Sequence, residues 1–267
     1  MSGQSPIPPT PKPSSGQALR AGSVPYLNVA PIVAGLEGRM RMVPPSELAV
    51  SLRRGDIDAG LLSITEALFH GDYDILDGPC VASFGEVYSV FLAHRGPIGE
   101  VRRVACDTAS LTSVNLLRVL LAERGLFPEF VPLRDRAAAG AEDFVMLIGD
   151  PAIEFRRGPH EHRIFDLGAG WRELTGLPFV FAAWVLRRDA DTAELRRELR
   201  AAAERGQRDF DAVIRSGTEF DEAFRRLYLT QYVRNIMGPA EKLGIAKFVE
   251  LLRRHSGRVV YDARFVG

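Results

Sequence analysis

The chain lacks an excess of charge of either sign. Its 267 residues include 34 Lys and Arg against 34 Asp and Glu, so the formal net charge is zero. A nucleic-acid-binding protein or a membrane-surface protein needs a net basic face. No apolar run reaches the roughly 18 residues that a membrane-spanning helix requires. We therefore expect neither a nucleic-acid partner nor a membrane.

Cysteine is scarce as well. Cys80 and Cys106 are too few for a disulfide framework, and they lack the CxxC spacing of a zinc or redox site. We expect two buried thiols in a reducing compartment. Residues 1–18 carry five prolines but neither the basic start nor the apolar stretch of a secretory signal. This segment is predicted to be a flexible tail, and the protein to be cytoplasmic.

The motifs that hold common cofactors are also missing. There is no GxxxxGK[ST], no GxGxxG after a strand, no GxSxG and no HExxH. These absences argue against a nucleotide cradle, a dinucleotide site and a hydrolase nucleophile. His160 and His162 form an HxH pair in a polar loop without a third ligand nearby, so we predict no metal and no cofactor.

What the chain does contain is a succession of strand and helix patterns in units of about 20–35 residues, which indicates a mainly parallel sheet covered by helices. Residues 87–93 and 179–186 read as buried strands. After residue 189 the pattern is helical only. Charged, leucine-spaced helices are predicted at 192–214, 219–232 and 239–255, with arginine pairs such as Arg225-Arg226 on solvated faces.

These patterns suggest an α/β protein with two lobes, two crossing strands and a ligand cleft between the lobes. The first lobe is predicted to comprise residues 19–93 and 182–267, and the second residues 94–181. The cleft is expected at the loops that follow the carboxyl ends of strands.

Small polar residues gather at several predicted strand ends. Ser110, Thr112 and Ser113 lie where a strand meets a helix start, and free N–H groups there suit a carboxylate or phosphate. Plain N-capping by Ser110 or Thr112 is the alternative. Asn28 and Ser46 are expected to cap short helices.

Six segments, in order, resemble the chorismate dehydratase family. They are VPYLNVAP (24–31), PSELAVSLRRGDIDAGLLS (45–63), GEVYSV (85–90), DTASLTSVNLLRVLL (107–121), LIGDPAI (147–153) and DLGAGWRELTGLPFVFAAWVLRR (166–188). That family catalyses the first committed step of the futalosine route to menaquinone and has the fold of periplasmic solute-binding proteins (type II). Two departures stand out: Pro25 replaces a frequent serine, and Glu86 puts a carboxylate beside the expected cleft.

The resemblance implies that chorismate is the substrate and loses water to give 3-[(1-carboxyvinyl)oxy]benzoate, without a metal or cofactor. Asn28 and Ser89 match the family's motif asparagine and serine and are the expected catalytic residues. Our hypothesis is that the substrate's own enolpyruvyl carboxylate takes the ring proton, with Asp150 as the alternative base. The residues expected to bind substrate are Tyr26, Ser110, Thr112, Ser113, Gly149 and Asp150.

Two other functions share this two-lobed architecture. A non-catalytic binding protein for a small carboxylate would have the same cleft, although it would normally be exported. The sibling enzyme that forms dihydroxynaphthoate in the same pathway is associated with a different start, where this chain has Val24-Pro25-Tyr26-Leu27-Asn28. The sequence does not indicate the oligomeric state.

Overall fold

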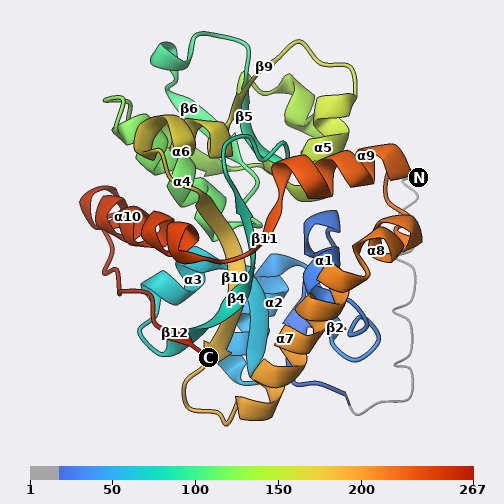
Figure 1. Ribbon diagram of the computed structural model, residues 1–267. Coiled ribbons are helices and arrows are strands. Elements are labelled where there is room, and N and C mark those ends of the chain that lie inside the picture. Colours follow the sequence, from blue (N-terminus) through green and yellow to red (C-terminus); the bar gives the residue numbers. More distant parts are fainter. Residues whose placement is uncertain (1–17) are drawn as a thin grey trace, which may run out of the picture.

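A computed structural model describes residues 18–267 and shows an α/β protein with two sheets, one in each of two lobes (Figure 1). The predicted tail therefore lies outside the described residues, apart from Ala18. The α/β class with two lobes agrees with the sequence prediction. No helix among residues 18–267 is long and apolar enough to cross a membrane.

The sheet of the first lobe has seven strands in the order β11-β4-β10-β3-β1-β2, with β12 paired to β4. β1 pairs in parallel with β2 and β3, whereas β10 runs antiparallel between β3 and β4. The strands are β1 (Ala21–Ser23), β2 (Arg41–Met42), β3 (Ala59–Ser63), β4 (Tyr73–Ser83), β10 (Phe179–Arg187), β11 (Arg234–Ile236) and β12 (Phe265–Val266).

The sheet of the second lobe has five strands in the order β7-β6-β8-β5-β9. β6 pairs in parallel with β7 and β8, and β5 runs antiparallel to β8 and β9. These strands are β5 (Val90–His94), β6 (Arg103–Cys106), β7 (Glu129–Pro132), β8 (Phe144–Ile148) and β9 (Arg163–Asp166).

The chain crosses between the lobes twice, between β4 and β5 and between α6 (Leu167–Thr175) and β10 (Figure 1). In each sheet, the first strand after a crossing lies between two strands and runs antiparallel to both. This strand is β5 in the second sheet and β10 in the first. The predicted boundary at residue 93 assigned most of β5 to the first lobe. Its hydrogen bonds lie in the second sheet instead, so the first crossing falls within residues 84–89.

The helices cover the sheets (Figure 1). They are α1 (Ala30–Val33), α2 (Pro45–Arg54), α3 (Ile64–Phe69), α4 (Leu111–Ala122), α5 (Gly149–Arg157), α6 (Leu167–Thr175), α7 (Ala193–Arg208), α8 (Phe210–Ser216), α9 (Glu222–Leu227) and α10 (Pro239–His255). Short 3₁₀ turns are η1 (Leu27–Val29), η2 (Ile98–Glu100) and η3 (Arg136–Ala141), and η4 (Tyr228–Tyr232) is a π-helix.

The helical C-terminal region matches the prediction in part. α10 has the predicted bounds, with Pro239 in its first turn. The predicted helix over 192–214 is divided at Asp209 into α7 and α8, and the one over 219–232 begins at Glu222 and ends as a π-helix. The predicted caps differ as well, because neither Ser46 nor Asn28 caps a helix with its side chain.

The long strand β4 was not predicted, and its sequence explains why. Gly78 and Pro79 interrupt the strand, and such a pair normally marks a turn. Here Gly78 adopts a φ of +112°, and the pairing with β10 shifts register between Ile75 and Cys80, so the interruption is accommodated as an irregularity within one strand. Cys80 and Cys106 are buried free thiols, as predicted.

Candidate active site

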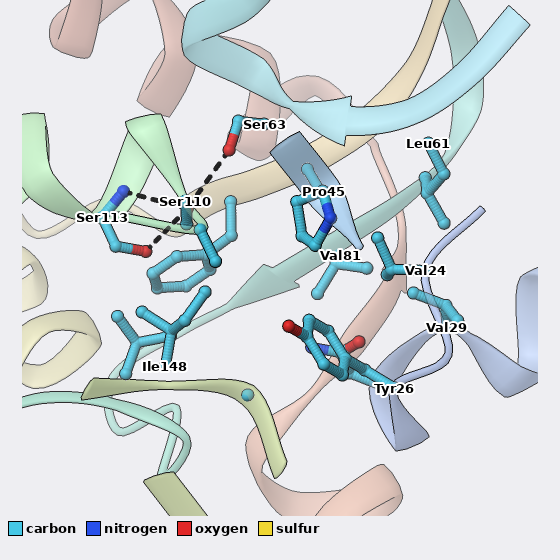
Figure 2. Close-up of a pocket in the computed structure, with 16 residues that line it drawn as sticks. Val24, Tyr26, Val29, Pro45, Leu61, Ser63, Val81, Ser110, Ser113 and Ile148 are labelled. Carbon is cyan, nitrogen blue, oxygen red and sulfur yellow. Dashed lines mark hydrogen bonds between the residues drawn. The ribbon is translucent and has the colours of Figure 1, made fainter. Parts of the chain in front are cut away.

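A cavity lies between the two sheets, where loops of both lobes meet (Figure 2). The cavity holds about 520 Å³ of empty space, part of which is open to solvent. The first lobe contributes Val24, Tyr26, Asn28, Val29, Pro45, Leu61, Ser63, Val81, Phe181 and Ala182, and the second contributes Val90, Ala109, Ser110, Ser113, Ile148 and Gly149. None of these lining residues is charged. Apolar walls with a few polar groups are typical of small-molecule sites.

Five of the eight predicted site residues line this cavity: Tyr26, Asn28, Ser110, Ser113 and Gly149. The other three, Ser89, Thr112 and Asp150, lie just outside its lining.

A serine cluster forms one side of the cavity (Figure 2). Ser110 is the N-cap of α4, and its Oγ accepts hydrogen bonds from the Ser113 backbone N–H at 3.2 Å and from Ser113 Oγ at 3.0 Å. With both lone pairs used, Ser110 must donate its own proton to Ser63 Oγ, 3.1 Å away. The proton of Ser63 is thereby left to donate to a ligand. Ser63 was not predicted as a site residue, although it is the last residue of the segment 45–63 that resembles the family.

Thr112, which was predicted to bind substrate, makes a contact between the lobes. Its side chain is fully buried, and its Oγ1 accepts a hydrogen bond of 3.0 Å from the backbone N–H of Thr65. Thr65 belongs to α3 in the first lobe and Thr112 to α4 in the second. Thr112 therefore joins the lobes behind the cavity.

Tyr26 and Gly149 lie against each other in the cavity wall. Gly149 has a φ of +66°, and a Cβ atom built on it would lie 3.3 Å from the Tyr26 ring. Glycine adopts this backbone conformation without strain and leaves room for the ring. Burial raises the pKa of Tyr26.

Behind Tyr26 lies an outer pocket that shares Tyr26, Pro45 and Ala109 with the cavity. Two arginines, Arg134 and Arg136, line this outer pocket. Arg136 makes two hydrogen bonds to Asp107, of 2.8 and 3.1 Å, so its charge is largely compensated.

Asp150 forms a further contact between the lobes. Its carboxylate accepts from the backbone N–H of Leu27 at 3.3 and 3.4 Å, which connects α5 of the second lobe to η1 of the first. Burial, assisted by repulsion from Glu219 and Glu154, raises the pKa of Asp150 to about 6, against the effect of the Leu27 hydrogen bond.

Ser89 is hydrogen-bonded to Tyr228, a residue that was not predicted from the sequence. Ser89 is fully buried, and its Oγ lies 2.7 Å from the hydroxyl of Tyr228 in η4. Burial raises the pKa of Tyr228, against the smaller lowering effects of Ser89 and Asn28. The Asn28 Oδ1 is buried and has no hydrogen-bond partner among residues 18–267. Tyr228 gave no signal in the sequence because it lies within a charged helical pattern.

The loop at the first crossing holds Ser89 in place. Asp166 accepts hydrogen bonds from the backbone N–H groups of Val87 and Tyr88, and Tyr88 has a φ of +68°. Glu86 is bound to Arg156 at 2.6 Å and does not line the cavity. The carboxylate that was expected beside the cleft is therefore neutralised.

No metal centre is found within the described part of the chain, where no group of three metal-binding side chains occurs. His160 stacks on Phe155 with ring centroids 5.0 Å apart, and His162 Nε2 lies 2.7 Å from the carbonyl oxygen of Glu142.

Comparison with known proteins shows the family. A family model described as menaquinone biosynthesis matches residues 19–254. The chain is 39% identical over 188 residues to a curated chorismate dehydratase of Thermus thermophilus, an alignment that covers 61% of this chain and 68% of the relative.

Solved structures show the same fold at low sequence identity. A protein of Archaeoglobus fulgidus aligns with a TM-score of 0.69 at 19% identity, covering 88% of this chain and 96% of that one. The periplasmic aliphatic sulphonate binding protein SsuA of Escherichia coli aligns with a TM-score of 0.60 at 17% identity, covering 95% and 94%. The fold is therefore that of the periplasmic binding proteins, and the chain belongs to the menaquinone biosynthesis family, as the resemblance of its motifs to chorismate dehydratases indicated.

Proposed function

We propose that this protein is a chorismate dehydratase, a carbon–oxygen lyase that converts chorismate to 3-[(1-carboxyvinyl)oxy]benzoate and water. The observation that carries the proposal is the 39% identity to the Thermus thermophilus enzyme of that name. The match of residues 19–254 to the menaquinone biosynthesis family supports it. The cytoplasmic location expected from the sequence stays a prediction.

The cavity suits this substrate. Its apolar walls fit a six-membered ring, and the Ser63 hydroxyl, the one in the serine cluster whose proton is left free, can donate to a carboxylate. Asn28 offers an amide that can bind the leaving hydroxyl. In the reaction a ring C–H proton passes to an acceptor, the C–O bond to the hydroxyl breaks, and the hydroxyl leaves with a proton as water. Aromatisation drives the step, so the protein mainly orients the substrate.

The residues that line the cavity support the substrate's own carboxylate as the proton acceptor. None of the lining side chains is a carboxylate, histidine or lysine. Asp150 lies outside the lining and is hydrogen-bonded to Leu27. We therefore assign the acceptor role to the enolpyruvyl carboxylate of the substrate, and Asp150 is the residue that would replace it if this assignment failed.

Incubation of the purified protein with chorismate, followed by chromatography and mass spectrometry, tests the proposal. We expect formation of 3-[(1-carboxyvinyl)oxy]benzoate, with a turnover rate about 100-fold lower in Asn28→Ala because a group that polarises the leaving hydroxyl is gone. Unchanged chorismate would contradict the proposal. Tight binding without turnover would then favour a binding protein, and turnover of a cyclised futalosine derivative would favour the sibling enzyme.

A further inference from the structure

The outer pocket beside the cavity lies where parallel strands of both sheets end. In the first lobe, Tyr26 and Pro45 come shortly after the parallel pair β1 and β2. In the second lobe, Asp107 directly follows β6, and Arg134 comes shortly after its parallel partner β7. Binding sites of α/β proteins form at such carboxyl ends of strands. The outer pocket, which holds about 1030 Å³ of empty space partly open to solvent, is therefore placed where both lobes can contact a ligand.

The outer pocket carries an excess of positive charge. Its lining includes Arg134 and Arg136 but only one carboxylate, that of Asp107. Arg136 is bound to Asp107 by two hydrogen bonds of 2.8 and 3.1 Å, so these two charges compensate each other. Arg134 is exposed, and its side chain has no hydrogen bond, ion pair or ring contact within residues 18–267. Its guanidinium is therefore free to bind an anion from solvent.

The first lobe contributes the start of a helix to the same pocket. Ser46 lies in the first turn of α2, and the N-cap residue Pro44 makes no side-chain hydrogen bond to that turn. The first N–H groups of a helix have no partner within it, and the helix dipole attracts anions to them. Glu47 belongs to the same turn but does not line the pocket. The outer pocket thus combines an unpaired guanidinium of the second lobe with an uncapped helix start of the first.

We infer that the outer pocket is the entrance through which the anionic substrate reaches the cavity, and that Arg134 attracts and binds a carboxylate of the substrate there. The inference rests on the proposed dehydratase function and adds Arg134 to the residues that bind substrate. Tyr26, Pro45 and Ala109 line both spaces, so a ligand in the outer pocket is in contact with the wall of the cavity.

Charge at the entrance matters because nothing else in the protein attracts an anion strongly. Chorismate carries two carboxylates, whereas the formal net charge of the chain is zero and none of the residues that line the cavity is charged. At physiological salt, charges are screened over about 8 Å, so only positive groups near the entrance guide a dianion toward it. Moving an anion into an uncharged site also costs desolvation free energy, and a guanidinium in the adjoining pocket offsets part of this cost.

The matched control for Arg134 is Arg102. It is also exposed, and its side chain has no partner in the part of the chain that the structure describes. Arg102 directly precedes β6, at the opposite end of that strand from Asp107 and the outer pocket. Arg225 would not serve, because it was predicted to be solvated but is 6% exposed and donates hydrogen bonds to three backbone carbonyl oxygens. Arg134→Gln and Arg102→Gln therefore remove the same charge from the same lobe at two different places.

Steady-state kinetics of the two variants on chorismate test the inference. At low salt we expect kcat/KM of Arg134→Gln to fall about tenfold, with kcat changed by less than about twofold. The reason is that the attraction favours binding of the substrate and of the transition state alike. Arg102→Gln should keep both constants. Equal constants for the two variants at low salt would overturn the inference, as would a fall in kcat alone.

The dependence on salt separates attraction of the anion from a structural effect of the substitution. The loss of kcat/KM in Arg134→Gln should shrink to less than about twofold at about 1 M NaCl, where charges are screened over about 3 Å. A loss that stayed about tenfold at this salt concentration would overturn the inference, because it would not come from the charge of Arg134.

Titration with isophthalate gives a readout that needs no turnover. This aromatic dianion carries two carboxylates on one ring, and its Kd is measured by calorimetry at low salt. We expect its Kd to be about fivefold higher for Arg134→Gln than for the wild-type protein, and unchanged for Arg102→Gln. A wild-type protein that bound isophthalate no more tightly than Arg134→Gln would overturn the inference. If the wild-type protein left chorismate unchanged, the proposed function would fail, and the isophthalate titration would still decide whether Arg134 binds anions.

Discussion

Replacing Asp150 by asparagine removes a buried charge at the contact between the lobes. The carboxylate accepts a single backbone N–H, that of Leu27, and burial raises its pKa from 3.8 to about 6. Asparagine retains an acceptor oxygen of the same size for Leu27 and carries no charge. The substitution therefore isolates the cost of keeping this carboxylate ionised in the folded protein.

The sign of the effect follows from the raised pKa. Between pH 3.8 and about 6 the folded protein holds a proton on Asp150 that the unfolded chain has lost, so this group's contribution to stability declines as pH rises through that window. A shift from 3.8 to about 6 corresponds to about 3 kcal/mol. Asp150→Asn should thus have nearly the wild-type free energy of unfolding at pH 4 and exceed it by up to about 3 kcal/mol at pH 8.

Urea unfolding of both proteins at pH 4 and pH 8 measures this difference. A variant that is less stable by the same amount at both pH values would refute the reasoning, because the hydrogen bond to Leu27 would then outweigh the cost of burial. Turnover of chorismate by the same variant adds a second readout. We expect kcat to stay near the wild-type value, since the substrate carboxylate is the assigned proton acceptor, and loss of activity would make Asp150 the base.

Further predictions concern the cavity walls. Thr112→Val leaves the buried N–H of Thr65 without a partner and should lower the free energy of unfolding by about 1–3 kcal/mol. The KM for chorismate should stay unchanged, and a raised KM would place Thr112 in contact with substrate. Gly149→Ala should lower the free energy of unfolding by about 1–3 kcal/mol because Gly149 has a φ of +66°. It should also raise KM by displacing the Tyr26 ring. A wild-type melting temperature and wild-type kinetics would contradict this. Ser110→Ala removes the N-cap of α4 and should lower the free energy of unfolding, measured in urea, by about 1 kcal/mol. It should also raise KM, and an unchanged KM would mean that the serine cluster is only a cap.

The elements with a clear periodic pattern could be predicted from the sequence, and those shaped by tertiary contacts could not. α10 has strong helical spacing and a first-turn proline, and its bounds were predicted. β4 was missed because Gly78 and Pro79 read as a turn, whereas pairing on both sides carries the strand through them. The local sequence does not show where pairing with neighbouring strands keeps a strand continuous across a glycine or proline.

The site shows the same division. Asn28, Ser110 and Ser113 follow strands at the cleft, so their place in the cavity could be predicted from topology. Tyr228 could not, because it comes from a helical segment more than 130 residues beyond Ser89 and its burial depends on how that segment packs. Thr112 has the same side-chain chemistry as a ligand-binding residue, and only the structure shows that it is buried, lies outside the cavity lining and accepts from the backbone of Thr65.

The most direct test is a crystal structure of the slow Asn28→Ala variant with chorismate bound. The ring should lie between Tyr26 and the Ser110–Ser113 side of the cavity, with one carboxylate accepting from the Ser63 hydroxyl and the enolpyruvyl carboxylate nearer to the ring proton than any side-chain base. Chorismate seated outside this cavity, or held with the Asp150 carboxylate against that proton, would contradict the account.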